Sequence, residues 1–174
     1  MINSKKNTCC FFGHRKIADA EMLWGRVYEV MEDLILHKNV DTFLMGSKSN
    51  FDALCRTVLS ELKEKYPHIK RVYIRAEYPD INEDYKNYLL KSCEETYYPK
   101  RARNAGKAVY IERNFEMIDK SEYCIAYFKE DYLPPRRKNS SRDLSDYQPK
   151  SGTAIAYRYA VKKKRTIINV IEQM

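Results

Sequence analysis

The sequence contains no long apolar run and no CxxC pair. No run approaches the roughly 18 consecutive apolar residues that a membrane span needs. The basic N-terminus, MINSKKNTCC, is followed by too few apolar residues before Gly13 to form the hydrophobic core of a signal peptide. No His or Cys has the spacing of zinc ligands. We therefore expect a cytoplasmic protein with no metal site and no membrane association, whose five cysteines are small buried thiols.

Internal repeats and a collagen-like or disordered composition are also missing. A chain of 174 residues is long enough for one domain with a sizeable core and too short for two comfortable ones. The formal net charge of +8 is clustered at Lys5 and Lys6, Arg101 and Arg103, Arg136 to Lys138, and Lys162 to Arg165. Such a surface favours anionic partners, but it does not distinguish a nucleotide from a nucleic acid or from a merely solvated face.

Short apolar strands alternate with amphipathic helices along the chain. Strands are expected at 8–12, 41–45, 70–75, 123–128 and 165–171, and a further short one at 108–110. Helices are expected at 19–37 with Asp19 as the N-cap, and at 51–65, 81–95, 111–118 and 152–163, with 96–107 as a loop. Several strands are apolar on both faces, which is typical of a parallel sheet covered by helices on each side. The sequence therefore predicts an α/β fold, a single Rossmann-like three-layer domain over 1–174 with a mostly parallel sheet flanked by helices.

The stretch 129–150 has no periodicity and is rich in proline, serine and charge. A segment of this length without secondary structure inside a compact domain is usually functional or disordered. A lid before the last helix and a disordered loop are both compatible with the sequence.

Three segments that leave strands or open helices share a character suited to an anion. Each combines a small residue with hydroxyls, a cation or a helix N-terminus, where free N–H groups favour phosphate. The ligands of open α/β sheets bind beyond the carboxyl ends of the strands, so these segments are expected to converge. Their residues are Gly13, His14 and Arg15; Gly46, Ser47, Lys48, Ser49 and Asn50; and Ser151, Gly152 and Thr153.

Each of these residues also has a simpler interpretation. Gly13 can merely end a strand, and Asn50 and Asp52 can merely cap the second helix and oppose its dipole. His14 and Arg15 are more specific, because a histidine can donate to a phosphate or exchange protons near neutral pH and an arginine can clamp a phosphate with two bonds. The group Glu112, Arg113, Asn114, Glu116 and Asp119 is typical of helix-surface charge.

Four stretches of the sequence resemble a known family. They are FFGHRK, MGSKSNFDALC, IERNFEMIDKSEYCIAYF and SGTAIAYRYAVKKKRTIINVI, and together they cover nearly the whole chain. The combination resembles the SLOG superfamily, a Rossmann-like group that includes the DNA-processing Smf proteins and the LONELY GUY cytokinin-activating enzymes. The likeness is greatest to its small YpsA/YoqJ-like bacterial and phage branch, which typically reads TGHR, GGAxGxD, RNxxMVDxSD and GGT before a helix.

The resemblance implies a pocket for a nucleotide or a nucleotide derivative such as ADP-ribose or NAD. The residues that match the family pattern are Gly13, His14, Arg15, Gly46, Asp52, Arg113, Asn114, Gly152 and Thr153. The second loop departs from the pattern at Ser47 and Asn50, where glycines are usual, and SGT has Ser151 in place of the first glycine. The LONELY GUY enzymes carry a catalytic glutamate in GGxGTxxE, whereas this chain has Ala156 there, so phosphoribohydrolase activity does not follow from the resemblance.

Three functions follow as hypotheses. The first is binding of a phosphate-bearing small molecule as a sensor or sequestering module, with no certain cofactor. The second is a nucleotide hydrolase or N-glycosidase in which His14, Asp52 or Glu116 is the acid–base group. The third is binding of single-stranded nucleic acid along a basic stripe. The resemblance also implies a homodimer.

Overall fold

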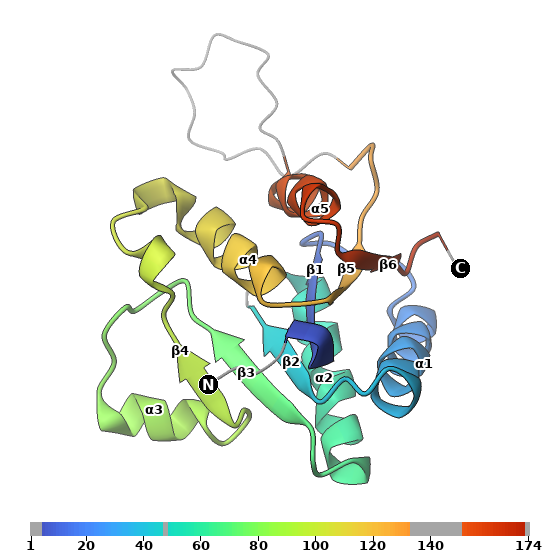
Figure 1. The fold of residues 1–174 in the computed structure, drawn as a ribbon, viewed down its shortest axis with the longest axis horizontal. Helices are drawn as coiled ribbons and strands as arrows, with labels where there is room; N and C mark the ends of the chain where they lie inside the picture. The colour runs from blue at the N-terminus through green and yellow to red at the C-terminus, as the bar shows by residue number, and fades with distance from the viewer. Residues whose placement is uncertain (1–4, 47–48, 133–150, 173–174) are drawn as a thin grey trace, which may run out of the picture.

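The computed structural model describes residues 5–46, 49–132 and 151–172 of the chain (Figure 1). Six strands form one sheet in the order β4-β3-β2-β1-β5-β6, and every neighbouring pair is parallel. The strands are β1 (Thr8–Gly13), β2 (Thr42–Met45), β3 (Lys70–Ile74), β4 (Glu95–Tyr97), β5 (Tyr123–Tyr127) and β6 (Thr166–Asn169). The predicted α/β fold with a Rossmann-like three-layer arrangement is confirmed.

Five α-helices flank the sheet. They are α1 (Ala20–His37), α2 (Asn50–Lys65), α3 (Glu83–Leu89), α4 (Val109–Asp119) and α5 (Gly152–Lys162). Helices α1 and α2 pack on one face of the sheet, whereas α4 and α5 pack on the other (Figure 1). Helix α3 connects β3 to β4 and buries none of its residues. No helix in the described part of the chain is long and apolar enough to span a membrane.

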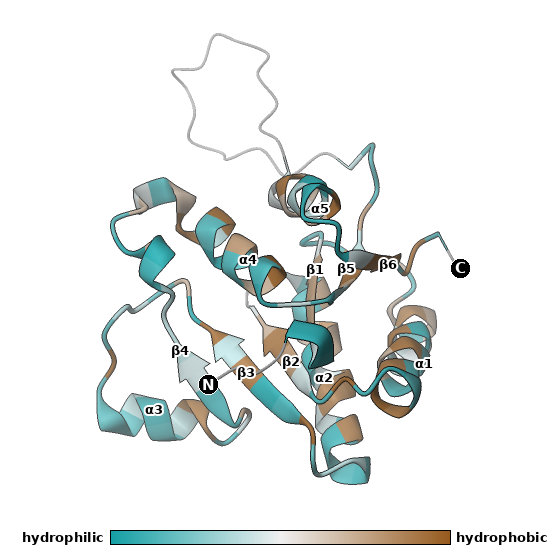
Figure 2. Cartoon of the chain, in the orientation of Figure 1, coloured by the Kyte–Doolittle hydropathy of each residue, from teal (hydrophilic) through white to brown (hydrophobic). Residues whose placement is uncertain are grey.

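The core lies in two layers because alternate residues of a strand point to opposite faces. In β1, Cys9 and Phe11 pack with α1 and α2, while Cys10 and Phe12 pack with α4 and α5. The central strands are therefore apolar on both faces, and Figure 2 shows the hydrophobic colour along them. In the same view α3 is hydrophilic over most of its length.

Several local predictions are wrong. Asp19 does not cap α1 through its side chain: it has a left-handed backbone, with a φ of 51°, and makes no capping hydrogen bond. Residues 108–110 are not a strand but the helical entry into α4. Helix α3 is shorter than 81–95, and the end of that range belongs to β4, which the sequence analysis did not predict. This edge strand is only three residues long, too short for an alternating pattern to show.

Candidate functional site

The order of the strands places a topological switch point between β1 and β5. From β1 the chain continues outward through β2, β3 and β4, then returns to pair β5 with the other side of β1. In open parallel sheets the crevice beyond the carboxyl ends at such a point is the usual ligand site. The two strands end at Gly13 and Tyr127, which lie opposite each other in register. His14 directly follows Gly13, so the first predicted anion-binding segment lies at this switch point.

His14 is held on three sides by the protein. Its side chain is almost fully buried, with 1% of the residue exposed. The backbone N–H of Lys129 donates to Nε2 at 2.8 Å, and Nδ1 lies 3.5 Å from Oγ of Ser151. The ring stacks on Tyr132 with centroids 3.8 Å apart. Burial lowers the pKa of His14, and an accepting Nε2 leaves the hydrogen of the neutral ring on Nδ1.

His14 therefore joins three separate elements at the switch point. Its ring links the end of β1 to the residues after β5 and to the start of α5. Ser151 is the N-cap of α5, because its Oγ accepts from the backbone N–H groups of Thr153 and Ala154 at 3.2 and 3.4 Å. The first and third predicted segments are thus in direct contact.

The second predicted segment meets the first through the backbone. The N–H of Asn50 donates to the carbonyl of Arg15 at 3.0 Å. Ser49, not Asn50 or Asp52, is the N-cap of α2, because its Oγ accepts from the N–H of Asp52 at 2.9 Å. Ser47 and Lys48 lie outside the described residues, as does 133–150, most of the stretch 129–150 that was predicted as a loop or lid.

Solvent-exposed groups from all three segments lie at this edge. Arg15, Asn50 and Gly152 are exposed. The side chain of Arg15 forms no ion pair or hydrogen bond within the described residues. Outside its chain neighbours and the backbone of its own helix, Gly152 has no described heavy atom within 4 Å of the position that a Cβ would occupy, so there is open space beside this residue at the start of α5, while the N–H groups of Thr153 and Ala154 donate to Ser151. An exposed cation and an exposed helix N-terminus are each suited to an anion.

Two of the predicted glycines are needed for close packing. A Cβ at Gly13 would lie 2.4 Å from Cδ1 of buried Phe51. A Cβ at Gly46 would lie 2.9 Å from Cζ of Arg113. The absence of a side chain at both positions is therefore explained by neighbours within the protein.

Arg113 and Asp52 lie beneath the second segment. Arg113 is 3% exposed, and it donates to the carbonyl of Ile74 at 3.3 Å and to Oδ1 of Asn114 at 3.0 Å. Burial lowers the pKa of this arginine, while the charge of Asp52 opposes the change. Burial also raises the pKa of Asp52, which the charge of Arg113 partly offsets. Both groups are buried, their opposite charges interact, and Arg113 packs against Gly46 just after β2.

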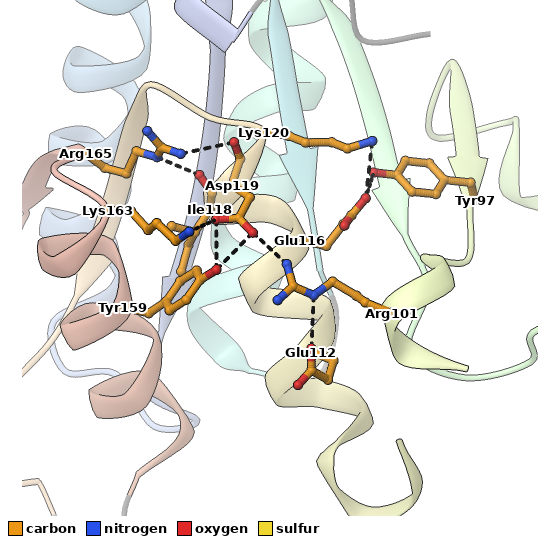
Figure 3. A network of polar contacts seen from close by, with 10 residues as sticks. All are labelled: Tyr97, Arg101, Glu112, Glu116, Ile118, Asp119, Lys120, Tyr159, Lys163 and Arg165. Atoms are coloured by element: carbon orange, nitrogen blue, oxygen red, sulfur yellow. Dashed lines mark hydrogen bonds and ion pairs between the residues drawn. The ribbon is translucent and has the colours of Figure 1, made fainter. Parts of the chain in front are cut away.

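A second polar region lies between α4 and α5, and we call it the Asp119 network (Figure 3). Asp119 accepts hydrogen bonds from Arg101 at 2.6 Å and from the hydroxyl of Tyr159 at 2.9 Å. Lys163 lies 3.7 Å from its carboxylate, and Arg101 also donates to Glu112 at 3.0 Å. Carboxylates on α4 thus neutralise cations from elsewhere in the chain.

Glu116, one of the candidate acid–base groups, belongs to this side of the molecule. It accepts from the hydroxyl of Tyr97 at 3.2 Å and pairs with Lys120 at 3.2 Å (Figure 3). Within the described residues no hydrogen bond or ion pair joins it to His14 or Asp52. The three candidates are therefore not gathered into one catalytic group.

Sequence reasoning missed two residues of the switch point, Lys129 and Tyr132. Both contact His14 from 115 and more positions away along the chain. The only signal was that they follow the apolar run 123–128, which was expected to be central in the sheet. The sequences of β1 and β5 do not indicate that these two strands pair.

No protein-family model matches this chain, and no curated protein is significantly similar to it. A functional proposal therefore depends on the fold and on the residues of this chain.

Proposed function

We propose that the protein binds a nucleotide or a nucleotide-derived ligand, such as ADP-ribose or NAD, at the switch point between β1 and β5. The observation that carries the proposal is the convergence of the three predicted segments. Hydrogen bonds join His14 to Ser151 and Asn50 to Arg15, so all three lie at one edge of the sheet. The resemblance to the SLOG superfamily supports the same site, and membership in it is part of this proposal.

Some of these residues are proposed to contact the ligand, and others to position the residues at this edge of the sheet. Arg15 and the start of α5 at Gly152 contact the phosphate, because both are exposed, the arginine is a cation and the helix dipole is positive there. His14 positions the start of α5, since its two nitrogens already face Lys129 and Ser151. Asp52 and Arg113 support the edge from within the core.

The two alternatives have less support from the geometry. For a hydrolase, His14 is buried and bonded, while Glu116 is paired with Tyr97 and Lys120. For a nucleic-acid binder, an unpaired basic stripe is needed, yet Arg101 pairs with two carboxylates and Arg103 pairs with Asp80. We therefore propose a binding module, acting as a sensor or by sequestering its ligand.

A thermal-shift panel tests the proposal. The protein is heated with AMP, ATP, NAD and ADP-ribose in turn. A ligand at a hundredfold excess over its Kd stabilises the folded state by about 2.7 kcal/mol. For a domain of this size, such a gain raises Tm by about 5–10 °C. Failure of every nucleotide species to raise Tm contradicts the proposal.

Two variants decide whether the binding site is the predicted one. Arg15→Ala is expected to abolish most of the shift, because it removes the exposed cation at the switch point. Lys162→Ala makes the same change of charge at the far end of α5 and is expected to leave the shift intact. Chromatography of the incubated nucleotides is expected to return them unchanged, and the appearance of free base or nicotinamide would favour the hydrolase instead.

A further inference from the structure

Three tyrosines form an exposed aromatic surface beside β3 and β4, at the lateral edge of the sheet opposite β6. Tyr78 follows β3, and Tyr85 and Tyr88 lie on α3. They are 61%, 36% and 64% exposed, respectively. Tyr78 meets Tyr85 edge to face, with centroids 5.9 Å apart, and Tyr85 lies parallel to Tyr88 at 6.1 Å. We call these three residues the tyrosine platform.

Packing of α3 against the core does not explain why these positions are aromatic. Each of the other four α-helices buries a hydrophobic stripe, whereas α3 buries no residue. Aromatic rings that face solvent in a contiguous group are typical of an interaction surface. Figure 1 shows α3 beyond the β3–β4 end of the sheet, well away from α5.

The platform is held in place from below by Arg75. This arginine is 7% exposed and donates to the carbonyls of Tyr78 and Pro79 at 3.3 and 3.4 Å. It also donates to Oγ1 of Thr96 on β4 at 3.2 Å. Tyr78 has a φ of 57°, a left-handed conformation that is unfavourable for a bulky residue and persists only where its surroundings enforce it. The segment that contains Tyr78 and Pro79 is therefore held in a defined conformation by its hydrogen bonds to Arg75, which is itself bonded to β4.

The segment that carries the platform is acidic, although the whole chain is basic and two arginines, Arg75 and Arg103, lie against this segment. Residues 77–88 contain four carboxylates and one lysine, while the chain has a formal net charge of +8. The carboxylates are Glu77, Asp80, Glu83 and Asp84, and all four residues are exposed. This charge disfavours a polyanion, whereas the faces of tyrosine rings and nearby carboxylates both attract cations.

The chain itself shows how an arginine is accommodated here. Arg103 lies 3.4 Å from the carboxylate of Asp80, and its guanidinium lies over the ring of Tyr98 at 5.9 Å. A second arginine from outside would find a carboxylate and a ring one turn apart at Asp84 and Tyr88, which lie four residues apart on α3.

We propose that the tyrosine platform docks an arginine- or lysine-rich segment of a partner protein. The cationic side chains lie on the faces of Tyr78, Tyr85 and Tyr88 and pair with the carboxylates beside them. This surface is separate from the nucleotide site proposed above, and it does not depend on that site.

The test uses a fluorescent peptide of alternating arginine and glycine and follows its anisotropy on addition of the full chain. The peptide is expected to bind, and Tyr85→Ala/Tyr88→Ala is expected to weaken it roughly tenfold, from two exposed cation–π contacts. Tyr85→Phe/Tyr88→Phe keeps the ring faces and is expected to retain most of the affinity. Leu36→Ala, an exposed residue on α1, is the matched control and is expected to change nothing.

Three outcomes overturn the proposal. One is no binding of the arginine peptide to the natural chain, and another is equal binding by the double alanine variant. The third is that the same double variant abolishes binding of a labelled oligothymidylate or dissolves a dimer of the chain, since the occupant is then a nucleic acid or a second copy. Because the tyrosines are exposed, a thermal melt is expected to show that the variants remain folded.

Discussion

The switch point and the Asp119 network are both polar, but they use their charges differently. In the Asp119 network Arg101, Lys120 and Lys163 are paired with carboxylates of α4, and Arg165 donates to backbone carbonyls (Figure 3). Asp119 alone accepts hydrogen bonds from Arg101 and Tyr159 and pairs with Lys163. At the switch point the groups that bond to or stack on His14 are the neutral backbone N–H of Lys129, the hydroxyl of Ser151 and the ring of Tyr132, while Arg15 is exposed without an ion pair in the described residues. Charge that is already neutralised stabilises a fold, whereas charge that is not remains available to a ligand.

The pKa directions reflect the same contrast. Burial acts to raise the pKa of Asp119, but hydrogen bonds from Arg101 and Tyr159 hold it below its ordinary value. At the switch point burial dominates and lowers the pKa of His14. The Asp119 network thus favours the ionised form of its central group, and the switch point favours the neutral form.

The largest expected effect comes from Gly13→Ala. The new methyl group would overlap Phe51, whose own Cβ lies 2.7 Å from its position, so rotation of the ring does not relieve the clash. We expect a loss of about 3 kcal/mol in the free energy of unfolding, measured in urea. In a Phe51→Gly background, which removes the Cβ as well as the ring, most of this penalty is expected to vanish. An equal penalty in both backgrounds would show that the glycine is needed for another reason.

His14→Ala is expected to destabilise the fold by about 2 kcal/mol, because the N–H of Lys129 loses its acceptor and Tyr132 loses its stacking partner. The effect is also expected to depend on pH. The pKa of His14 lies below 6.5 in the folded state, so the unfolded chain takes up its proton first as pH falls. The natural chain therefore loses stability as pH falls through 6.5, and the variant loses less. Parallel pH profiles would contradict a buried neutral His14.

Asp119→Asn is expected to cost about 1 kcal/mol, because the ion pairs of the Asp119 network are only partly buried. The cost is expected to shrink in high salt, where such pairs are screened. Asn keeps the shape and an acceptor for Tyr159, so urea melts at two salt concentrations isolate the charge. If salt does not change the loss of stability, ion pairs do not account for it, and the Asp119 network is then stabilised by neutral contacts, as His14 is at the switch point.

Arg15→Ala has the smallest expected effect on stability, within about 0.5 kcal/mol, because the side chain is exposed and makes no described contact. This is the variant expected to lose the nucleotide-induced rise in Tm. A large loss of stability without ligand would show that Arg15 belongs to the fold and not to a binding surface.

The sequence predicted the centre of the fold better than its edge. Apolar runs such as those of β1 and β5 are buried on both faces and are recognisable by composition alone. The strand β4 was missed because it has three half-buried residues and depends on its pairing with β3. Helix α3 was predicted too long because its sequence has helical residues, whereas the burial of Cys93 in the core and the pairing of β4 from Glu95 onward depend on distant parts of the chain.

The candidate site was predicted in its position and less well in its roles. The three segments do meet at one edge, as strand direction requires. The partners of His14, however, are 115 and 137 positions away, and nothing local reveals that both nitrogens are engaged. The glycines were attributed to a ligand, whereas Gly13 and Gly46 have sufficient causes in Phe51 and Arg113.

The ring of His14 has one more consequence, for how the chain tolerates insertion. Tyr132 stacks on one side of the imidazole, and Ser151 faces its Nδ1, so the two ends of the intervening 18 residues are brought together by a group outside them. The entropy of closing such a segment grows slowly, by about 0.6 kcal/mol for each doubling of its length. A chain lengthened by several residues between Tyr132 and Ser151 is therefore expected to keep both contacts of His14 and to lose little stability.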